Sequence, residues 1–287
     1  MKGVTINPKG FHKGQIKFYV VLIPLALFMA LPIVYIINHA FKPLSELYAF
    51  PPRFFVHSPT TDNFRNLAKV SGGSMVSVGR YAFNSILVTA LVVLANMIVG
   101  SMAGFALSKL EFKGKKVLFE INTLSMMFVP AAVLIPRYLV MDKIHIMDTY
   151  FAHILPLLAM PVGMFLVKQF IDQVPDELME AAVMDGANKF TVYRIVILPL
   201  IKPALATVCI LSFQQVWGNL ETSNMFTTRE SMRTLAFFMN TLINANASVA
   251  GQGISAAAAL IMFVPNIVLF IILQSNVMNT MAYSGIK

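Results

Sequence analysis

Apolar residues in this chain gather in long runs that are separated by short polar stretches. A bilayer crossing needs roughly 20 mainly apolar residues, because the hydrocarbon core is about 30 Å thick and a helix rises 1.5 Å per residue. Six runs qualify, at about 18–38, 82–106, 117–136, 149–170, 200–220 and 255–275. All should be helical, because backbone polar groups in lipid need internal partners and no run alternates like a barrel strand. The pattern predicts an all-α polytopic membrane protein with one transmembrane domain over residues 1–287.

Helix-disturbing residues fall inside most of these runs. Prolines predict kinks, since proline removes a backbone donor; they are Pro24, Pro32, Pro130, Pro136, Pro156, Pro161 and Pro265. The second run carries Gly100 and Gly104 at the GxxxG spacing that lets two helices approach closely, although most such matches are ordinary packing. The connections 39–81 and 221–254 are rich in turn-forming residues, and one short helix is expected in each, around 62–70 and 232–244.

Lysine and arginine indicate the orientation. The clearest clusters lie before the first run and between the second and third, at Lys2, Lys9, Lys13, Lys17, Lys109, Lys113, Lys115 and Lys116. Short cytoplasmic loops carry an excess of these residues, whereas long loops count little. We therefore predict that both termini are cytoplasmic. The first run is longer than the apolar part of a signal peptide and no small-residue cleavage site follows, so it is expected to stay as an anchor.

Composition excludes several classes of protein. The chain is 57% hydrophobic and 12% charged, with mean hydropathy +0.72, whereas soluble domains carry about 25% charged residues. The net charge of +9 lies largely in juxtamembrane clusters and forms no basic stripe, so nucleic acid is not an expected partner. The single Cys209 lies in an apolar run, which gives neither a disulfide framework nor metal-ligand spacing. No metal site is expected.

Polar residues at membrane depth are neutral. No carboxylate is placed for the proton or cation site that an ion-coupled carrier commonly uses. The polar residues at depth are Asn84, Asn96, Asn122, Thr123, Ser125, Gln214, Gln215, Trp217, Asn219 and Asn266. Amides suit hydroxyl-bearing substrates, since they donate and accept without a charge to desolvate, but any single one could equally bond helix to helix. Gln215, Trp217 and Asn219 are predicted to lie near a translocation path.

A charged insert at 171–199 separates the fourth and fifth runs. Asp176 and Glu177 after Pro175 indicate a helix start, because acidic residues complement the positive end of the helix dipole. The helix should end at Gly186, which can adopt the left-handed conformation that follows many helices. Its predicted face consists of Leu178, Ala181, Ala182 and Asp185, with Glu180 off it.

The insert should continue into a second short helix. Asn188 is expected to cap it, with Phe190, Tyr193 and Ile197 on one face. Pro199 is expected to open the fifth run. A bilayer crossing alone has little need of such an element, so we interpret it as a docking surface for a partner.

The insert also resembles a known motif. Glu180-Ala181-Ala182, three residues, Gly186, nine residues and Val196-Ile197-Leu198-Pro199 resemble the EAA motif of permease subunits of bacterial ABC importers, with Val196 where isoleucine is usual. Asp185-Gly186-Ala187 and the stretch Leu198 to Pro203 resemble the carbohydrate class. Further similarity to the smaller, six-span maltose-type permease covers most of the chain, including Ala40-Phe41-Lys42-Pro43 and Phe83-Asn84-Ser85. Trp217-Gly218-Asn219-Leu220 departs from the usual Trp-Asn-Glu-Phe at its last three positions.

The resemblance implies a type I importer permease whose insert carries coupling helices that lie in a groove of a cytoplasmic ATPase. Glu180 would face a basic residue of that ATPase, and Gly186 would permit the turn at the contact. The implied coupling residues are Glu180, Ala181, Ala182, Asp185, Gly186, Ala187, Leu198 and Pro199, with 284–287 as a weaker contact. No catalytic residue is expected. The chain has no G-x-x-x-x-G-K-[ST] loop, so ATP and Mg would be held by the partner and no cofactor by this chain.

The favoured hypothesis is therefore a permease subunit of an ABC importer for a sugar or oligosaccharide in the bacterial cytoplasmic membrane. The expected partners are a homologous second permease, two ATPase subunits, an extracytoplasmic sugar-binding protein and the lipid bilayer. A secondary carrier or channel for a neutral solute remains an alternative, disfavoured by the missing buried carboxylate and by the insert. An ABC importer of peptides, phosphate or amino acids is a third possibility.

Overall fold

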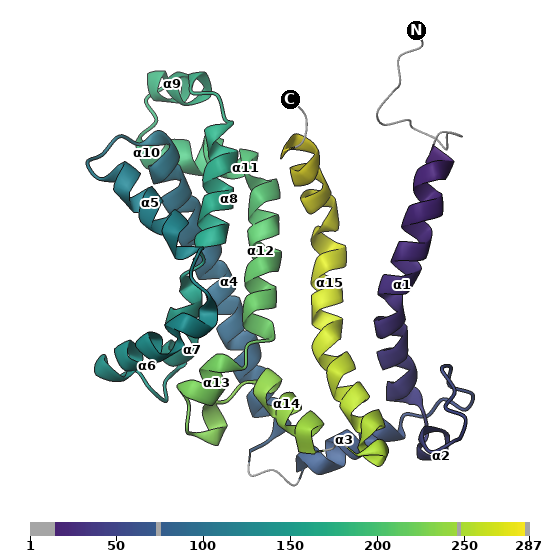
Figure 1. The fold of residues 1–287 in the computed structure, drawn as a ribbon. Helices are drawn as coiled ribbons and strands as arrows, with labels where there is room; N and C mark the ends of the chain where they lie inside the picture. Colours follow the sequence, from purple (N-terminus) through teal and green to yellow (C-terminus); the bar gives the residue numbers. More distant parts are fainter. Residues whose placement is uncertain (1–14, 73–75, 246–247, 285–287) are drawn as a thin grey trace. The chain divides into compact units, whose positions relative to one another are not determined.

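The structure is a computed structural model that describes residues 15–72, 76–245 and 248–284. Every regular element in these ranges is helical, as the sequence predicts (Figure 1). The chain divides into two compact units, Met1–Val70 with Ile243–Leu260, and Ser71–Leu242 with Ile261–Lys287. Each unit is described by itself.

The first unit is built on α1 (Ile16–Phe41), whose most apolar stretch is entirely exposed. The short helix α2 (Leu44–Leu47) was not expected, whereas α3 (Asp62–Gly72) confirms the predicted helix around 62–70. Asn63 is buried and its amide donates to the carbonyls of Ala40 and Lys42 at 3.0 and 2.8 Å. This amide satisfies carbonyls that the end of α1 leaves open and attaches α3 to it.

The second unit is organised around α4 (Val78–Lys109). Its helices pack on α4 chiefly through α8 (Pro161–Asp172) and α12 (Lys202–Trp217). Gly104 allows the closest approach, because a Cβ there would lie 2.9 Å from Cγ1 of Val167 on α8. Gly100, by contrast, faces open space. Only the second glycine of the predicted pair therefore serves helix packing in this chain.

Among the described residues, three helices are long and apolar enough to cross a membrane: α1, α4 and α15 (Gln252–Ser284), the last over Gln252–Ser275. They contain the first, second and sixth predicted runs. The third and fourth runs each fall on a helix pair with a sharp bend, where the sequence predicts proline kinks, and the fifth run lies in the second helix of a third such pair. The pairs are Lys115–Ser125 with Pro130–Lys143 at 109°, Tyr150–Leu158 with Pro161–Asp172 at 45°, and Lys189–Leu200 with Lys202–Met225 at 79°.

Proline explains where these breaks fall. Pro130 and Pro161 lie in the first turns of η2 (Pro130–Val133) and α8, where a missing backbone N–H costs nothing. The fifth run bends at Ile201, and Pro203 lies in the first turn of α12, so Pro199 does not open that helix as predicted. Of the prolines expected to disturb helices, Pro24, Pro32, Pro156 and Pro265 lie within continuous helical turns.

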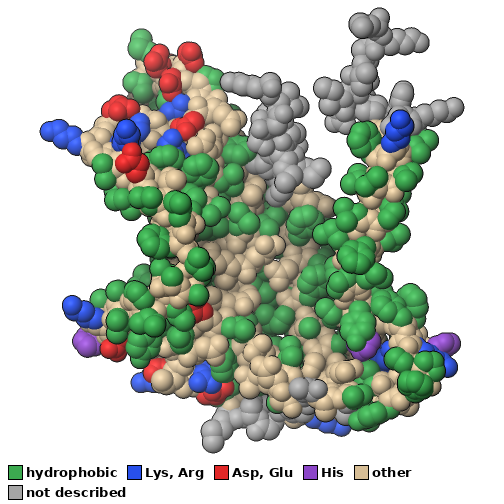
Figure 2. Space-filling model, viewed as in Figure 1, with side chains coloured by type: hydrophobic (Ala, Val, Ile, Leu, Met, Phe, Trp, Pro, Cys, Tyr) green, Lys and Arg blue, Asp and Glu red, His purple; other side chains and the backbone are tan. Residues whose placement is uncertain are grey.

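The remaining helices complete the second unit. They are α5 (Lys115–Ser125), α6 (Leu134–Lys143), α7 (Tyr150–Leu158), α9 (Glu177–Met184), α10 (Lys189–Val192), α11 (Leu198–Leu200), α13 (Glu221–Met225) and α14 (Leu235–Ala245). Helix α14 confirms the helix expected around 232–244. The two ends of α4 lie about 48 Å apart, given 32 residues at 1.5 Å each. Charged side chains gather at both ends of this unit, with an apolar band between them (Figure 2).

Candidate functional site

The 171–199 segment forms the compact helical element between α8 and α12 that the sequence predicts. Helix α9 follows Asp176 and carries Glu177 and Glu180 in its first turn, where they complement the helix dipole. The chain then forms α10, a π-helical turn at Tyr193–Ile197 and α11. Two short helices joined near Gly186 are therefore confirmed.

The turn at Gly186 has the geometry of a Schellman motif. Gly186 has φ +87° and donates its N–H to the carbonyl of Val183 at 2.9 Å, while Ala187 donates to Ala182 at 2.9 Å. A Cβ at Gly186 would meet nothing within 4 Å. Glycine is thus required here by its backbone conformation and not by space. Asn188 then caps α10, its side-chain oxygen accepting from Thr191 N at 2.9 Å.

The inner side of the segment is fixed in a buried cluster. Tyr193, Ile197 and Ile201 pack there with residues of α4, α8 and α12. The hydroxyl of Tyr193 is hydrogen-bonded to that of Ser101 on α4 at 2.7 Å, and its ring lies 5.6 Å from that of Phe105. A displacement of the segment would therefore be transmitted to these three helices, because packed interiors deform little.

A lysine adds a polar attachment to the same region. Lys109, the last residue of α4, donates from Nζ to the carbonyl of Val174 and to Asp176 Oδ1, both at 2.6 Å. One residue earlier, Ser108 bonds to Asp172 at 2.5 Å. Sequence reasoning used Lys109 only for orientation and missed this contact. Nothing in a single sequence pairs two residues 67 positions apart.

The outer side of α9 carries acidic and apolar side chains that are exposed together. Among the described residues, no side chain forms an ion pair or hydrogen bond with the carboxylate of Glu180 or Asp185. Leu178, Val183 and Met184 are also exposed, Met184 to 88%. Acidic side chains over α9 are visible at one end of the molecule (Figure 2). Large apolar side chains on an otherwise polar element indicate a surface that a partner covers.

The predicted alanine face is divided between the two sides. Ala181 is exposed, while Ala182 is half-buried and Met179 packs against the buried cluster. Leu198 packs against the same cluster, whereas Pro199 is exposed and lines a hollow of about 640 Å³ together with Leu178. Of the eight implied coupling residues, Leu198 and Ala182 therefore lie on the inner side of the 171–199 segment and contribute to its packing.

Most of the polar residues at depth bond within the chain. Asn96 donates to the carbonyl of Leu157 at 3.1 Å and to Ser212 Oγ at 2.8 Å, and Asn122 donates to the carbonyl of Pro161 at 3.2 Å. The two amides thereby satisfy carbonyls on either side of the α7–α8 break. Asn84, Thr123, Ser125 and Asn266 also donate to backbone carbonyls. For these residues the structure favours helix-to-helix and local bonding.

The three residues predicted near a translocation path are placed differently from one another. Gln215 is exposed on α12, as is Gln214. Trp217 is buried and donates from its indole to the carbonyl of Met262 at 3.0 Å, and Asn219 accepts from the amide of Thr222 at 2.9 Å. The path stays a prediction, and Gln215 is the one of its three predicted residues whose side chain is exposed.

Two further expectations concern other parts of the chain. The tail expected to contact the ATPase begins at Ser284, the last residue of α15, and 285–287 lie outside the described residues. In the described ranges, no group of three or more histidine, cysteine, aspartate or glutamate side chains could hold a metal ion.

Comparisons with known proteins find similar sequences among transport proteins. The family model described as binding-protein-dependent transport system inner membrane component matches residues 96–276. The arabinooligosaccharides transport system permease protein AraQ of Halalkalibacterium halodurans is 27% identical over 92% of this chain and 93% of that protein. The melibiose/raffinose/stachyose import permease protein MelC of Bacillus subtilis is 29% identical over 80% of this chain and 83% of its own length.

A solved structure shares the fold. A chain of a bacterial ABC transporter involved in the import of the acidic polysaccharide alginate matches with a TM-score of 0.77 and 21% identity, over 93% of this chain and 99% of that one. The likeness therefore extends over nearly the whole chain.

Proposed function

The chain belongs to the family of inner membrane components of binding-protein-dependent transport systems, and we propose that it moves a sugar or oligosaccharide through an ABC importer coupled at its 171–199 segment. It is a multi-pass inner membrane transport subunit and is not itself catalytic. The energy for transport enters from a separate ATPase, which holds ATP and Mg.

A sugar cargo is supported by the relatives and by the exposed amides. Both relatives described above are named for oligosaccharide transport. Gln214 and Gln215 are exposed at the depth of an apolar helix, where an amide facing lipid would be costly. The exposure of both glutamines is explained if this face of α12 is turned toward a hydrated path and a second, homologous permease. Each amide can donate to and accept from a sugar hydroxyl.

The topology that fits these features has six spans with both termini in the cytoplasm. Each bent helix pair then counts as one span. Lys109, Lys115 and Lys116 lie at the end of α4 nearest the 171–199 segment, which agrees with the excess of positive charge in short cytoplasmic loops. The opposite end of α4 is then extracytoplasmic, where a sugar-loaded binding protein delivers the cargo.

The observation that carries the coupling role is the contrast between the two sides of α9. Its outer side exposes carboxylates that have no partner among the described residues, beside apolar side chains, while its inner side packs on the cluster shared by α4, α8 and α12. An ATPase groove with a basic residue opposite Glu180 complements that outer side. Closure of two ATPase subunits on ATP then moves α8 and α12 as semi-rigid bodies. ATP can drive this movement of α8 and α12 only if the ATPase makes different contacts with the permease in the inward-open and outward-open states.

A reconstituted complex tests this function. ATPase stimulation should be measured across a panel of sugar-loaded binding proteins, in liposomes that contain both permeases and the ATPase. Glu180→Lys should abolish stimulated ATPase activity and uptake. Glu177→Lys makes the same charge change one turn earlier, outside the EAA motif, and should have a much smaller effect. Uptake that survives removal of the ATPase would overturn the proposed function.

A further inference from the structure

The end of α4, the start of α5 and one residue of α8 enclose a cavity of about 560 Å³, called here the α4–α5 cavity. Its polar lining consists of Ser108, Glu111, Lys115, Lys116 and Lys168, and the rest of the lining is apolar or glycine. The cavity lies where the second, third and fourth apolar runs meet the charged end of the second unit (Figure 2). It is therefore placed at a boundary between bilayer and water.

Positive charge dominates the lining, with three lysines against one carboxylate. The side chain of Lys115 is 26% exposed; it pairs with Glu111 at 2.9 Å and donates to the carbonyl of Ser108 at 3.2 Å. Because Glu111 is 91% exposed, solvent screens this pair. Lys116 is equally exposed and comes only within 4.0 Å of Glu120, which does not line the cavity. The cavity thus keeps positive charge that its own lining does not neutralise.

The third lysine is held in place by the helices around it. Lys168 on α8 has a side chain that is 15% exposed and pairs with Asp172 at 2.7 Å. Its Nζ lies 4.6 Å from the ring centre of Phe119 on α5, and that ring stacks on Phe165 of α8. Such cation–π and aromatic contacts join the two helices. One wall of the cavity is therefore already formed before a ligand enters.

The first turn of α5 adds backbone donors to the same place. Gly114, with φ +88°, precedes the helix and has no side chain that could cap it. Among the described residues, the amides of Lys116 and Val117 donate to no carbonyl or side chain. The helix dipole places partial positive charge at this end. Free amides at a helix start, beside lysine side chains, favour a phosphate group.

An apolar strip continues from the cavity along α5. Val117, Ile121 and Leu124 follow one another at the i, i+4, i+7 spacing of one helix face, and Leu118 lies beside them. Each of these four side chains is more than half exposed. All belong to the third apolar run, so they lie at the depth of the hydrocarbon core. A phospholipid needs a site for its phosphate and a surface for its acyl chains, and this corner of the chain offers both.

We propose that the α4–α5 cavity binds the phosphate of an anionic phospholipid whose acyl chains lie along the apolar strip of α5. A lysine cluster next to a membrane span attracts anionic lipids. An anionic lipid suits a positive cavity better than a zwitterionic one, because its headgroup carries no ammonium group to oppose Lys116. The bound lipid contacts α4, α5 and α8 together and stabilises their packing, since it binds only the folded state. The site needs only a chain in the bilayer, whatever its cargo.

Matched substitutions in the lysine cluster test this site. Lys116→Gln and Lys113→Gln each remove one exposed lysine, but only Lys116 lines the cavity. Each assembled complex is purified in detergent and titrated with phosphatidylglycerol or with phosphatidylcholine that has the same acyl chains. Native mass spectrometry counts the bound lipids, and the thermal midpoint reports stabilisation. Inorganic phosphate is added as a competitor, to distinguish a lipid site from a site for free phosphate.

The wild type is expected to bind phosphatidylglycerol about fivefold more tightly than phosphatidylcholine. Lys116→Gln should lose about fivefold in affinity for phosphatidylglycerol, and Lys113→Gln less than about twofold. An equal loss in both variants would indicate a diffuse attraction, and no loss in Lys116→Gln would place the lipid elsewhere; either result would overturn the proposal. Equal binding of the two lipids by the wild type would overturn it as well, even if a variant failed to assemble. Displacement of phosphatidylglycerol by millimolar inorganic phosphate would assign the cavity to free phosphate instead.

Discussion

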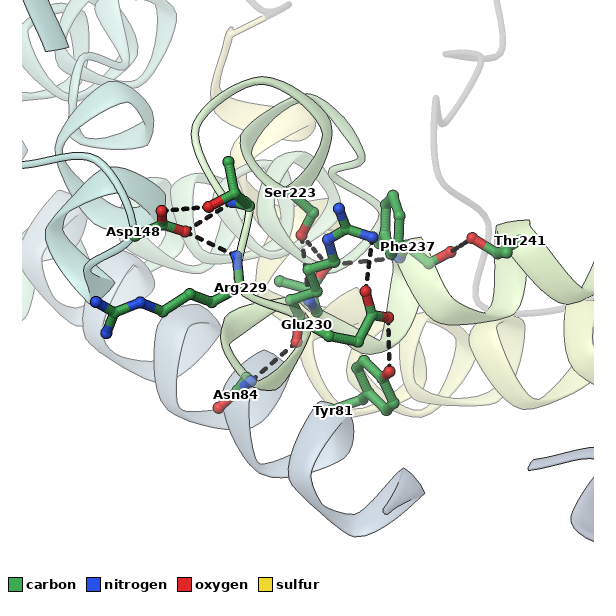
Figure 3. A network of polar contacts seen from close by, with 11 residues as sticks. Tyr81, Asn84, Asp148, Ser223, Arg229, Glu230, Phe237 and Thr241 are labelled. Carbon is green, nitrogen blue, oxygen red and sulfur yellow. Dashed lines mark hydrogen bonds and ion pairs between the residues drawn. The ribbon is translucent and has the colours of Figure 1, made fainter. Parts of the chain in front are cut away.

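The two ends of α4 differ in whether the nearby charged side chains are bonded within the chain. At the Lys109 end, α9 exposes large apolar side chains and the carboxylates of Glu180 and Asp185, and neither carboxylate has a partner among the described residues. At the Val78 end, the carboxylates of Asp148 and Glu230 and several backbone groups of 227–234 are used in internal bonds (Figure 3). Exposed carboxylates beside apolar side chains are what the proposed docking of an ATPase at α9 requires. The 227–234 segment, by contrast, is held in place by bonds within the chain.

The two ends are also connected to the rest of the second unit in different ways. The 171–199 segment is joined to α4, α8 and α12 through one buried cluster and through Lys109. The fourth apolar run is broken at residues 159–160, between α7 and α8. A movement of α8 could bend the chain at this break, whereas α4 is one continuous helix that joins the cluster directly to Asn84.

Replacing Gly186 should have the largest effect on function. Gly186→Pro cannot reach φ +87° and loses the bond to Val183, so the Schellman turn cannot form. We expect an inserted, stable protein with no measurable ATP-driven uptake. Gly186→Asn is the matched control, because asparagine tolerates the left-handed conformation, and it should retain most of the uptake. Wild-type uptake by Gly186→Pro would contradict the docking role of this turn.

At the other end, Asn84 should matter for stability. Asn84→Ala removes the donors to Ser231 and Arg233 and the acceptor of the Tyr150 hydroxyl, in a fully buried position. Unsatisfied buried groups cost about 1–3 kcal/mol each, so we expect the free energy of unfolding to fall by roughly 2–3 kcal/mol. Glu180→Ala, on the exposed surface of α9, should leave the thermal midpoint unchanged. Equal stability of Asn84→Ala and Glu180→Ala would show that the internal bonds around Asn84 do not make that end of α4 more stable than α9.

Lys109 tests the attachment of the coupling segment to α4. Lys109→Met keeps the length of the side chain but removes the donor to Val174 and the ion pair with Asp176. We expect stability to fall by about 1 kcal/mol, because Asp176 is largely exposed and solvent screens its charge. The sugar transported per ATP hydrolysed should fall as well. Lys113→Met, in the neighbouring loop, is the control, and an unchanged transport ratio in Lys109→Met would show that this contact does not serve coupling.

The smallest expected effect is the pH dependence contributed by Asp148. Partial burial alone would raise its pKa, but hydrogen bonds from Thr228 and Arg229 outweigh burial and hold the pKa below its usual value. A carboxyl whose pKa is lower in the folded state stabilises the fold above the unfolded pKa of about 3.9, and loses that effect as the pH falls through the folded pKa.

Comparing Asp148→Asn with the wild type isolates this contribution. The difference between their thermal midpoints should be largest at neutral pH and should shrink below about pH 4, where the wild-type carboxyl becomes protonated. A difference that stays constant from pH 7 to pH 3.5 would show that the carboxylate charge does not hold the 227–234 segment.

The parts that were predictable from the sequence are those decided by local patterns. The long apolar runs specify α1, α4 and α15, and Gly186 and Asn188 specify the end of α9 and the start of α10 through capping geometry. The breaks were only half predictable, because proline marks a weak point in a helix without fixing whether the chain turns by 45° or by 109°. That choice depends on which neighbours satisfy the freed carbonyls, as Asn96 and Asn122 do for α7 and α8.

The contacts that distinguish the two ends were not predictable. Lys109 with Asp176, Asn84 with Ser231, and Tyr193 with Ser101 each join residues far apart in the chain. Charge counting assigned Lys109 to topology, and composition assigned Asn84 to either a substrate path or helix packing. Only the folded arrangement shows which polar side chains are used in bonds within the described chain and which, like that of Glu180, are exposed.

Hydrogen exchange of the permease complex with and without its ATPase tests the central claim most directly. The amides of α9 and the Gly186 turn are expected to exchange rapidly when the ATPase is stripped away, because α9 is short and exposed, and to become protected when the ATPase binds. The amides of 227–234 should be slow in both states, since buried and half-buried side chains from other elements hold this segment. An α9 that gains no protection from the ATPase, while the complex remains assembled, would contradict the account.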